Sequence, residues 1–385
     1  MKPDIRKITR LVPRDGNLVQ GQSELAIDAE LAKAASEAIS RSQNHYSPAE
    51  GVDELRRAVA QKIAAFNHID VNPQAQPLEL LITPGATGAL VAIARAWLAG
   101  ASAIVFEPYY PYHRRIPDEL GGRTEVVPLH GPDLELDGDE LRRRCAALKD
   151  RQSYPLRAII VCSPANPTGK VFTQRELETI AALCQEFDLL CISDEVYEHY
   201  VLSERTHLSI ATLEGMRERT ITVNSFSKSW NISGWRLGYV YGDGKLIAPL
   251  NNANNVFYVC SPTPLQHALS AVLMSTPGYY AELRERFQRK RQFAAEVLES
   301  VGFELYNSGS AFYVWARIPR QYQDAMPLNE LLISNGVAGV PGSAFAESDQ
   351  HDRFMRFCIA REDQVLETAL DRIKNTLSHV NLAAG

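Results

Sequence analysis

The sequence predicts an α/β protein whose central sheet is largely parallel, and two patterns support this prediction. From about residue 79, short and nearly continuous apolar runs alternate with helical patterns. Continuous apolar runs are typical of strands in a sheet that helices cover on both faces, and alternation with helices favours parallel pairing. The strand-like runs cover residues 80–82, 103–106, 158–162, 189–192, 220–223 and 237–241.

The helical patterns have recognisable beginnings and change in character late in the chain. Thr173 and Glu176 form a capping-box pattern that opens an amphipathic run to Phe187. A long charged helix is predicted over about residues 278–300, and strands with helices around them follow it. This change predicts a second, smaller α+β unit. The later strands lie near residues 312–316 and 356–360, and the expected domains are 45–280 (large) and 1–44 with 281–385 (small).

Composition and charge exclude several classes of protein. Of the 385 residues, 45% are hydrophobic and 22% charged, and the formal net charge is −6. These values are typical of a folded protein without a broad basic face for nucleic acid. No apolar run matches a secretory signal or a membrane span, and the six cysteines lack metal-ligand spacing. We therefore expect a cytoplasmic protein that holds no metal and binds neither nucleic acid nor a membrane.

Polar motifs follow five of the predicted strands. In an open α/β sheet, ligands bind in the crevice at the carboxyl ends of the strands. We therefore expect these motifs to line one crevice. They are Gly85-Ala86-Thr87, Tyr109-Tyr110, Asn166-Pro167-Thr168-Gly169, Asp194-Glu195-Val196-Tyr197 and Ser225 to Lys228.

Lys228 lies in a short stretch with Ser225, Ser227 and Arg236. A lysine can form a Schiff base with pyridoxal phosphate, while hydroxyls and a guanidinium can bind the phosphate. The motif that begins at Gly85 adds free backbone N–H groups and a positive helix end for the same anion. A solvated basic turn is the alternative for such a stretch by itself, and the accompanying motifs favour the cofactor.

Asp194 ends a buried strand, where a carboxylate needs a cationic partner. A pyridinium nitrogen can be that partner, and its protonation lets the ring accept electrons from a substrate carbanion. Asn166 and Tyr197 can both donate to the phenolate oxygen of such a ring, and Tyr110 can stack on it. Turn capping by Asp194, an Asn-Pro turn, a core tyrosine and an aromatic loop are the competing explanations.

Arg356 lies within an apolar run, where an unpaired guanidinium is costly. The carboxylate of an amino-acid substrate could bind it in bidentate geometry. An internal salt bridge is the competing explanation.

Together these segments resemble the aspartate-aminotransferase family, the class I and II aminotransferases among the fold-type I pyridoxal-phosphate enzymes. The resemblance runs from about Gly21 to the C-terminus. It rests on S-x-S-K followed by G-x-R-x-G, with N-P-T-G, D-E-x-Y and P-G-x-x-F in the family's order. It implies a mostly parallel seven-stranded sheet in the large domain, pyridoxal 5'-phosphate as cofactor and a homodimer with shared active sites.

The resemblance also implies roles for individual residues. Lys228 would form the Schiff base and move the α-proton, Asp194 would pair with the pyridine nitrogen, and Tyr197 would bond the phenolate oxygen. Arg356 would bind the substrate α-carboxylate, with Asn166, Gly21 and Gln22 as further substrate-binding residues. The other implied cofactor-binding residues are Gly85, Ala86, Thr87, Tyr110, Asn166, Ser225, Ser227, Arg236 and, from the neighbouring subunit, Tyr46.

The chain departs from the family pattern at the substrate entrance. Gly21-Gln22-Ser23 stands where the family usually has Gly-Glu-Pro, and Cys358 stands where a small residue is usual. No residue can be assigned as a second arginine for a dicarboxylate side chain, so the substrate stays open. The expected reaction moves an amino group between an L-amino acid and a 2-oxo acid. The alternatives are β- or γ-elimination, replacement or cyclisation in specialised metabolism, and a non-catalytic relative that senses an effector.

Overall fold

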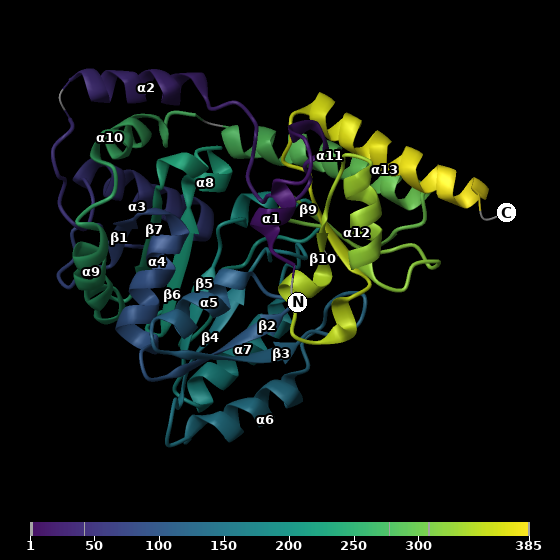
Figure 1. Cartoon of the computed structure of the whole chain (residues 1–385). Coiled ribbons are helices and arrows are strands. Elements are labelled where there is room, and N and C mark those ends of the chain that lie inside the picture. Colours follow the sequence, from purple (N-terminus) through teal and green to yellow (C-terminus); the bar gives the residue numbers. More distant parts are fainter. Residues whose placement is uncertain (1–2, 42, 277, 307–308, 384–385) are drawn as a thin grey trace.

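The computed structural model describes residues 3–41, 43–276, 278–306 and 309–383, and the strands in this part of the chain form two sheets. The larger sheet has seven strands in the order β1-β7-β6-β5-β4-β2-β3, and the smaller has four in the order β10-β11-β9-β8. Figure 1 shows the smaller unit, in green and yellow, beside the larger sheet. The predicted α/β fold with a smaller α+β unit is confirmed.

The larger sheet is mostly parallel. Strand β7 runs antiparallel between β6 and β1, and the other pairs are parallel. The carboxyl ends of β1, β2, β4, β5 and β6 therefore lie at one edge. The strands are β1 (Leu80–Thr83), β2 (Ser102–Glu107), β3 (Arg123–Pro128), β4 (Leu156–Cys162), β5 (Leu190–Asp194), β6 (Thr220–Ser225) and β7 (Gly238–Gly242).

Strand β3, which pairs with β2 at the edge of the sheet, was not predicted from the sequence. Its first residue is exposed and only Val127 is fully buried. An edge strand of this kind carries no continuous apolar run, which was the signal used for the others.

Helices cover both faces of the larger sheet. Along β4, Ile160 packs into one apolar cluster, while Ile159 and Val161 pack into another on the opposite face. The predicted capping box of Thr173 and Glu176 is present at the start of α7. One face is covered by α4 (Gly85–Ile93), α5 (Pro111–Glu119) and α9 (Gly244–Tyr258), the other by α3 (Asp53–Asn67), α6 (Gly138–Lys149), α7 (Gln174–Glu186) and α10 (Thr263–Val272).

The smaller sheet is antiparallel and packs against long helices, as Figure 1 shows. The strand predicted near residues 356–360 begins two residues earlier, at Phe354, and the long helix predicted over 278–300 is α11. The elements are β8 (Glu304–Leu305), β9 (Tyr313–Arg317), β10 (Val340–Pro341), β11 (Phe354–Cys358), α11 (Tyr279–Ser300), α12 (Ala325–Ser334) and α13 (Asp363–Ala383).

The N-terminal residues contact both units. Helix α1 (Ile5–Thr9) packs through Ile8 on the smaller unit, and Asn17 pairs with Ala338 in a parallel bridge. Helix α2 (Ala29–Ser40) instead lies against α10 on the side of the larger sheet. The predicted domain boundaries stay a prediction. No helix in the described residues is long and apolar enough to span a bilayer.

Candidate active site

Lys228 lies on α8 (Phe226–Ser229), a short helix that starts where β6 ends. The Ser225 side chain caps this helix by accepting a bond from the Ser227 N–H at 3.1 Å. The Lys228 Nζ donates to the Gly21 carbonyl at 2.6 Å. Burial lowers the pKa of Lys228 to about 8, and the charges of Arg356 and Arg236 act in the same direction.

The backbone around Lys228 is held by aromatic residues. The Tyr200 hydroxyl donates to the Lys228 carbonyl at 2.7 Å, and the Tyr279 hydroxyl donates to the Ser229 carbonyl at 2.8 Å. Trp230 stacks on Tyr279 with ring centroids 4.2 Å apart. These contacts fix the backbone from which the lysine side chain extends into the crevice.

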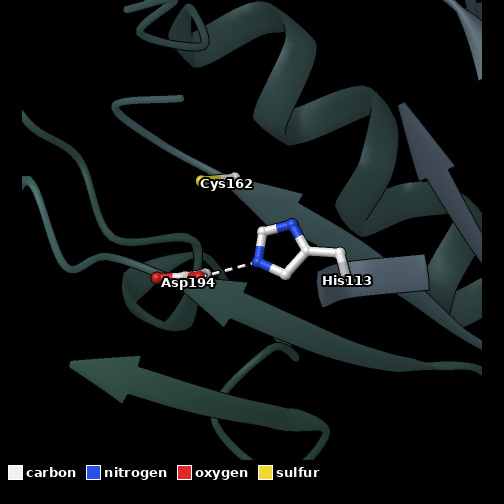
Figure 2. Close-up of side chains that lie close together, drawn as sticks. All are labelled: His113, Cys162 and Asp194. Carbon is white, nitrogen blue, oxygen red and sulfur yellow. Dashed lines mark hydrogen bonds and ion pairs between the residues drawn. The ribbon is translucent and has the colours of Figure 1, made fainter. Parts of the chain in front are cut away.

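Asp194, at the end of β5, is paired with His113 of α5, as Figure 2 shows. The Asp194 Oδ2 lies 2.7 Å from the His113 Nε2, and Oδ1 accepts a weaker bond from the Val196 N–H at 3.3 Å. Both Asp194 and His113 are buried. The histidine holds the carboxylate in one orientation at the carboxyl edge of the sheet.

Cys162 lies beside this pair (Figure 2), and the three side chains offer possible metal-ligand atoms within 4.8 Å of one another. Burial raises the pKa of the Cys162 thiol well above its usual range, and the charge of Asp194 raises it further. A thiol must lose its proton to bind a metal. The geometry therefore favours a hydrogen-bonded His113–Asp194 pair next to a neutral thiol.

A small cradle lies at the first turn of α4. Gly85, Ala86 and Thr87 are the first three residues of this helix, where backbone N–H groups lack partners within the helix. A Cβ atom on Gly85 would come within 2.6 Å of an Arg236 Nη atom, and one on Gly238 within 2.9 Å of the Ala86 nitrogen. The absence of side chains at the two glycines therefore keeps the helix end and the guanidinium close together.

Arg356 is buried on β11 and faces the crevice. Its Nη1 donates to the Asn166 Oδ1 at 2.8 Å, and its Nη2 donates to the Val19 carbonyl. Its guanidinium carbon lies 4.5 Å from the ring centroid of Tyr313 and 4.8 Å from that of Phe345. Its Nε is buried without a hydrogen-bond partner. No carboxylate is paired with Arg356 in the described residues, so the predicted alternative of an internal salt bridge is not found.

Tyr197 and Tyr313 meet in the same crevice, where their hydroxyls are 2.8 Å apart. Burial raises the pKa of Tyr197 well above its ordinary value, and its neighbour Tyr313 adds to this. Tyr197 therefore keeps its proton and can donate a hydrogen bond. A Cβ atom on Gly21 would come within 2.1 Å of the Tyr313 hydroxyl oxygen, so only glycine fits where this loop passes the tyrosine.

The structure brings most of the predicted residues together and leaves one apart. Tyr110 lies at the start of α5, with its ring centroid 5.3 Å from that of His113. Tyr46 is 84% exposed, and it lines a separate surface hollow with Thr263 and His267. Within the described residues, no hydrogen bond or ring contact joins Tyr46 to the other predicted site residues.

Sequence reasoning missed His113 and Tyr313. His113 follows Tyr110 by three residues in a predicted loop, and only the helix α5 puts the two side chains on one face. Tyr313 belongs to a strand of the smaller unit, and nothing local links it to Tyr197. The i,i+3 spacing was a usable signal for His113. The sequence around Tyr313 carried no comparable signal.

Comparison with known proteins identifies the family. The sequence profile described as "Aminotransferase class I and II" matches residues 16–373. The chain is 32% identical to an aspartate aminotransferase of Pyrococcus abyssi over 94% of this chain and 91% of that protein. It is 31% identical to kynurenine–oxoglutarate transaminase 3 of Bos taurus over 93% of this chain and 84% of that protein. The solved N-succinyldiaminopimelate aminotransferase from Mycobacterium tuberculosis superposes with a TM-score of 0.91 at 32% identity, over 97% of this chain and 96% of that one.

Fold and crevice thus define an enzyme of the fold-type I class that uses pyridoxal 5'-phosphate. The chain belongs to the class I and II aminotransferase family, whose members use this cofactor to move an amino group between an amino acid and an oxo acid. The residues present fit the cofactor. The crevice holds an amine of lowered pKa, a glycine-lined helix end beside Arg236 and a buried carboxylate fixed by His113.

Proposed function

We propose that this chain transfers an amino group between an L-amino acid and a 2-oxo acid in the crevice that contains Lys228, Asp194 and Arg356. The observation that carries the proposal is the setting of the Lys228 amine. It is buried, its pKa is lowered to about 8, and it lies within electrostatic reach of Asp194 and two arginines. An amine of this kind can act as a nucleophile and as a base near neutral pH.

Each charged residue of the crevice has a distinct task in this proposal. When bound, pyridoxal 5'-phosphate supplies an aldehyde that condenses with amines and a ring that draws electrons from the substrate's α-carbon. The Asp194 carboxylate, oriented by His113 at 2.7 Å, would favour a protonated ring nitrogen in the bound cofactor. The Lys228 Nζ removes the proton from the substrate's α-carbon.

Arg356 binds the substrate's α-carboxylate. Its Nε has no hydrogen-bond partner, and its two Nη atoms bond neutral oxygens of Asn166 and Val19. A carboxylate forms stronger, charge-assisted bonds to a guanidinium than neutral oxygens do. Fixing the carboxylate at this point orients the α C–H bond toward Lys228.

The neutral side chains of the crevice would hold the cofactor. Tyr197, which keeps its proton, and Asn166 would donate to the phenolate oxygen of the ring, and Tyr110 would stack on the ring. Gly21 and Gln22 line the substrate side through their backbone. The phosphate would be bound by Ser225, Ser227, Arg236 and the cradle formed by Gly85, Ala86 and Thr87.

We further propose a homodimer in the cytoplasm in which Tyr46 reaches the phosphate of the partner's site. Tyr46 is 84% exposed on a loop away from the crevice of its own chain. All six cysteines are free, as suits a reducing compartment.

The test is formation of 2-oxo acid from a panel of amino acids, each supplied with a different 2-oxo acid as the amino-group acceptor, by protein loaded with pyridoxal 5'-phosphate. Lys228→Ala should reduce the rate by about 10³-fold or more, because both the nucleophile and the base are removed. Lys33→Ala, which removes an exposed lysine on α2, is the matched control and should keep the wild-type rate. Borohydride treatment of the loaded wild-type protein should attach the cofactor to Lys228, as peptide mass spectrometry can show.

Two outcomes would contradict the proposal. One is a wild-type rate of transamination in Lys228→Ala. The other is exchange of the substrate's α-proton with solvent without release of a 2-oxo acid that keeps the substrate's side chain. The second outcome would favour elimination, replacement or cyclisation.

A further inference from the structure

The backbone carbonyls of residues 17–22, here called the carbonyl segment, are all occupied by hydrogen-bond donors. Leu18 accepts from the backbone N–H of Cys358 at 2.8 Å. The other five carbonyls, those of Asn17, Val19, Gln20, Gly21 and Gln22, accept bonds from the side chains of three cationic residues, Lys228, Arg356 and Arg361. The negative ends of these five carbonyl dipoles thus point at three buried cationic side chains.

Arg361 bonds the segment from behind the crevice. It follows β11 and is 1% exposed. Its Nε donates to the Asn17 carbonyl at 2.6 Å, its Nη2 to that of Gln20 at 2.9 Å and its Nη1 to that of Gln22 at 3.2 Å. One planar guanidinium therefore fixes three points of the segment, which the point charge of a lysine cannot do.

The same segment presents two carbonyls to the crevice. The Val19 carbonyl accepts from the Arg356 Nη2, and the Gly21 carbonyl accepts from the Lys228 Nζ at 2.6 Å. Both cations are enclosed by protein, where a charged group without hydrogen-bond partners is costly. The positions of the Val19 and Gly21 carbonyl oxygens therefore determine where the Arg356 guanidinium and the Lys228 ammonium are most stable.

Other bonds hold the ends of the segment, whereas in its middle Arg361 shares the carbonyls with Arg356 and Lys228. The Leu18 N–H donates to the Ala338 carbonyl at 3.1 Å, and the Glu24 N–H donates to the Ala360 carbonyl at 2.9 Å. Among the described residues, the carbonyls of Gln20 and Gln22 receive bonds from outside the segment only from Arg361 and, at 4.0 Å, from the Cys358 thiol. Without Arg361, the carbonyls of Gln20 and Gln22, on either side of Gly21, would lose their guanidinium donor.

We propose that Arg361 is a positioning residue for the aminotransferase reaction: by binding the carbonyls of Asn17, Gln20 and Gln22, it fixes the carbonyl segment so that Arg356 and Lys228 are aligned for the substrate. The inference rests on the roles proposed above for those two residues.

The experiment compares Arg361→Lys and Arg361→Met with the wild-type holoenzyme. Because small displacements of reacting groups are expensive, kcat/KM for the best amino acid of the panel should fall about 100-fold in Arg361→Met, with the loss divided between KM and kcat. Arg361→Lys keeps the charge and should recover only part of the loss. The Kd of the cofactor-free protein for inorganic phosphate should stay at the wild-type value, because the proposed phosphate cradle lies on other elements.

A second readout follows the segment itself and needs no activity. Hydrogen exchange of a peptide that covers residues 17–24, measured by mass spectrometry on the cofactor-free protein, should be faster in both variants. The matched control is Arg14→Met. Arg14 also lies near Glu24, at 3.7 Å, as Arg361 does at 3.4 Å, but it is exposed and bonds none of the six carbonyls. This control should keep wild-type exchange and kinetics.

The inference is wrong if exchange of residues 17–24 is unchanged in both Arg361 variants. It is also wrong if exchange becomes faster while kcat/KM stays at the wild-type value, or if Arg361→Lys restores full activity. If Arg361→Met does not fold, Arg361→Lys alone decides between these outcomes. Failure of the proposed function would show separately, as transamination by Lys228→Ala.

Discussion

At the scale of single residues, Lys228 lies between opposing influences. Burial and the charges of Arg356 and Arg236 disfavour its ammonium form, while the charge of Asp194 and the bond to the Gly21 carbonyl favour it. The balance lowers the pKa of Lys228 to about 8. The amine is thus close to its titration midpoint under conditions in which an ordinary lysine is charged.

The lowered pKa predicts an unusual pH dependence of lysine reactivity in the cofactor-free protein. An amine-directed electrophile reacts with the unprotonated form, so the rate of Lys228 modification should rise with pH to a midpoint near 8 and then level off. Peptide mass spectrometry after brief labelling measures this rate. Exposed Lys33 on α2 serves as the internal reference in the same sample. A Lys228 midpoint near 10 would contradict the described electrostatics.

The sequence predicted the residues that follow strands and missed those that depend on tertiary placement. Lys228 and Asp194 could be found because a polar residue after a buried strand is a local signal. Arg361 carries no such signal. It looks like a charged residue after a strand, and its three carbonyl partners lie more than 300 positions earlier in the chain. Contacts of that kind are set by the packing of the smaller unit.

At the scale of elements, a buried polar network joins α3 to the ends of β5 and β6. The Glu198 carboxylate accepts from the Lys62 Nζ, from the Asn67 Nδ2 at 2.7 Å and from the Asn224 Nδ2 at 2.6 Å. Burial raises the pKa of Glu198, but the charges of Lys62, His199 and His207 together outweigh burial and hold the pKa below its usual value. Glu198 follows Tyr197, and Asn224 precedes Ser225. The network therefore braces two segments of the candidate active site from behind.

This network predicts a marked loss of stability when one charge is removed. Lys62→Met leaves the buried Glu198 carboxylate without its cation and should lower the free energy of unfolding by about 3 kcal/mol. Adding Glu198→Gln removes the stranded charge, keeps an acceptor for Asn224, and should restore most of the loss. Unfolding in urea, followed by far-ultraviolet circular dichroism, measures both variants.

The matched control for the network is Lys290→Met. Lys290 is as buried as Lys62 and also donates to the Arg361 carbonyl at 2.8 Å, but its carboxylate partner Asp363 is 70% exposed and can be solvated once the lysine is gone. The cost there should be about 1 kcal/mol, mainly for the lost bond to the carbonyl. Equal losses in Lys62→Met and Lys290→Met, or a double variant no more stable than Lys62→Met, would show that buried charge does not govern the network.

Prediction of elements followed the strength of their local pattern. The buried strands and the capped helix α7 had strong patterns and were found, whereas β3 was missed because it lies half-exposed at the edge. The parallel direction of β1, β2, β4, β5 and β6 followed from the alternation with helices. The antiparallel insertion of β7 could not be predicted in this way, because the pairing direction depends on which strands meet in space.

At the scale of the whole molecule, the crevice lies where the carboxyl edge of the larger sheet meets the smaller unit. Arg356 of β11 bonds Asn166 beyond β4, and the Tyr109 N–H bonds the Phe345 carbonyl at 3.0 Å. The carbonyl segment passes between the two units. A site built from both units explains why no single stretch of sequence describes it.

One surface of the larger unit exposes apolar residues. Val256, Phe257 and Val259 near the end of α9 are 80%, 45% and 47% exposed, and Tyr46 is 84% exposed. Gln266 links the segment after Tyr46 to the segment after Val259. Its Nε2 donates both to the Ser47 Oγ at 3.1 Å and to the Ser261 carbonyl at 2.8 Å. Clustered exposed apolar residues favour an interface with another chain, and the proposed homodimer would cover them.

The proposed dimer with shared sites predicts that two impaired variants can complement each other. Tyr46→Ala removes a hydrogen bond to the partner's phosphate and should weaken binding of pyridoxal 5'-phosphate by about tenfold or more, while Lys228→Ala is inactive. In a hybrid dimer, Lys228 of one subunit and Tyr46 of the other complete one site, and the second site lacks both. Hybrids that carry two different affinity tags and are purified through both should therefore show half of the wild-type rate at limiting cofactor.

The matched control for complementation pairs Lys228→Ala with Asp194→Ala. Both residues belong to one crevice of one chain, at the ends of neighbouring strands β6 and β5. A hybrid of these two variants has one defect in each site and should stay inactive. Absence of activity in the Tyr46→Ala and Lys228→Ala hybrid, or equal activity in both hybrids, would mean that Tyr46 does not act across a subunit boundary. The exposed loop would then need another explanation.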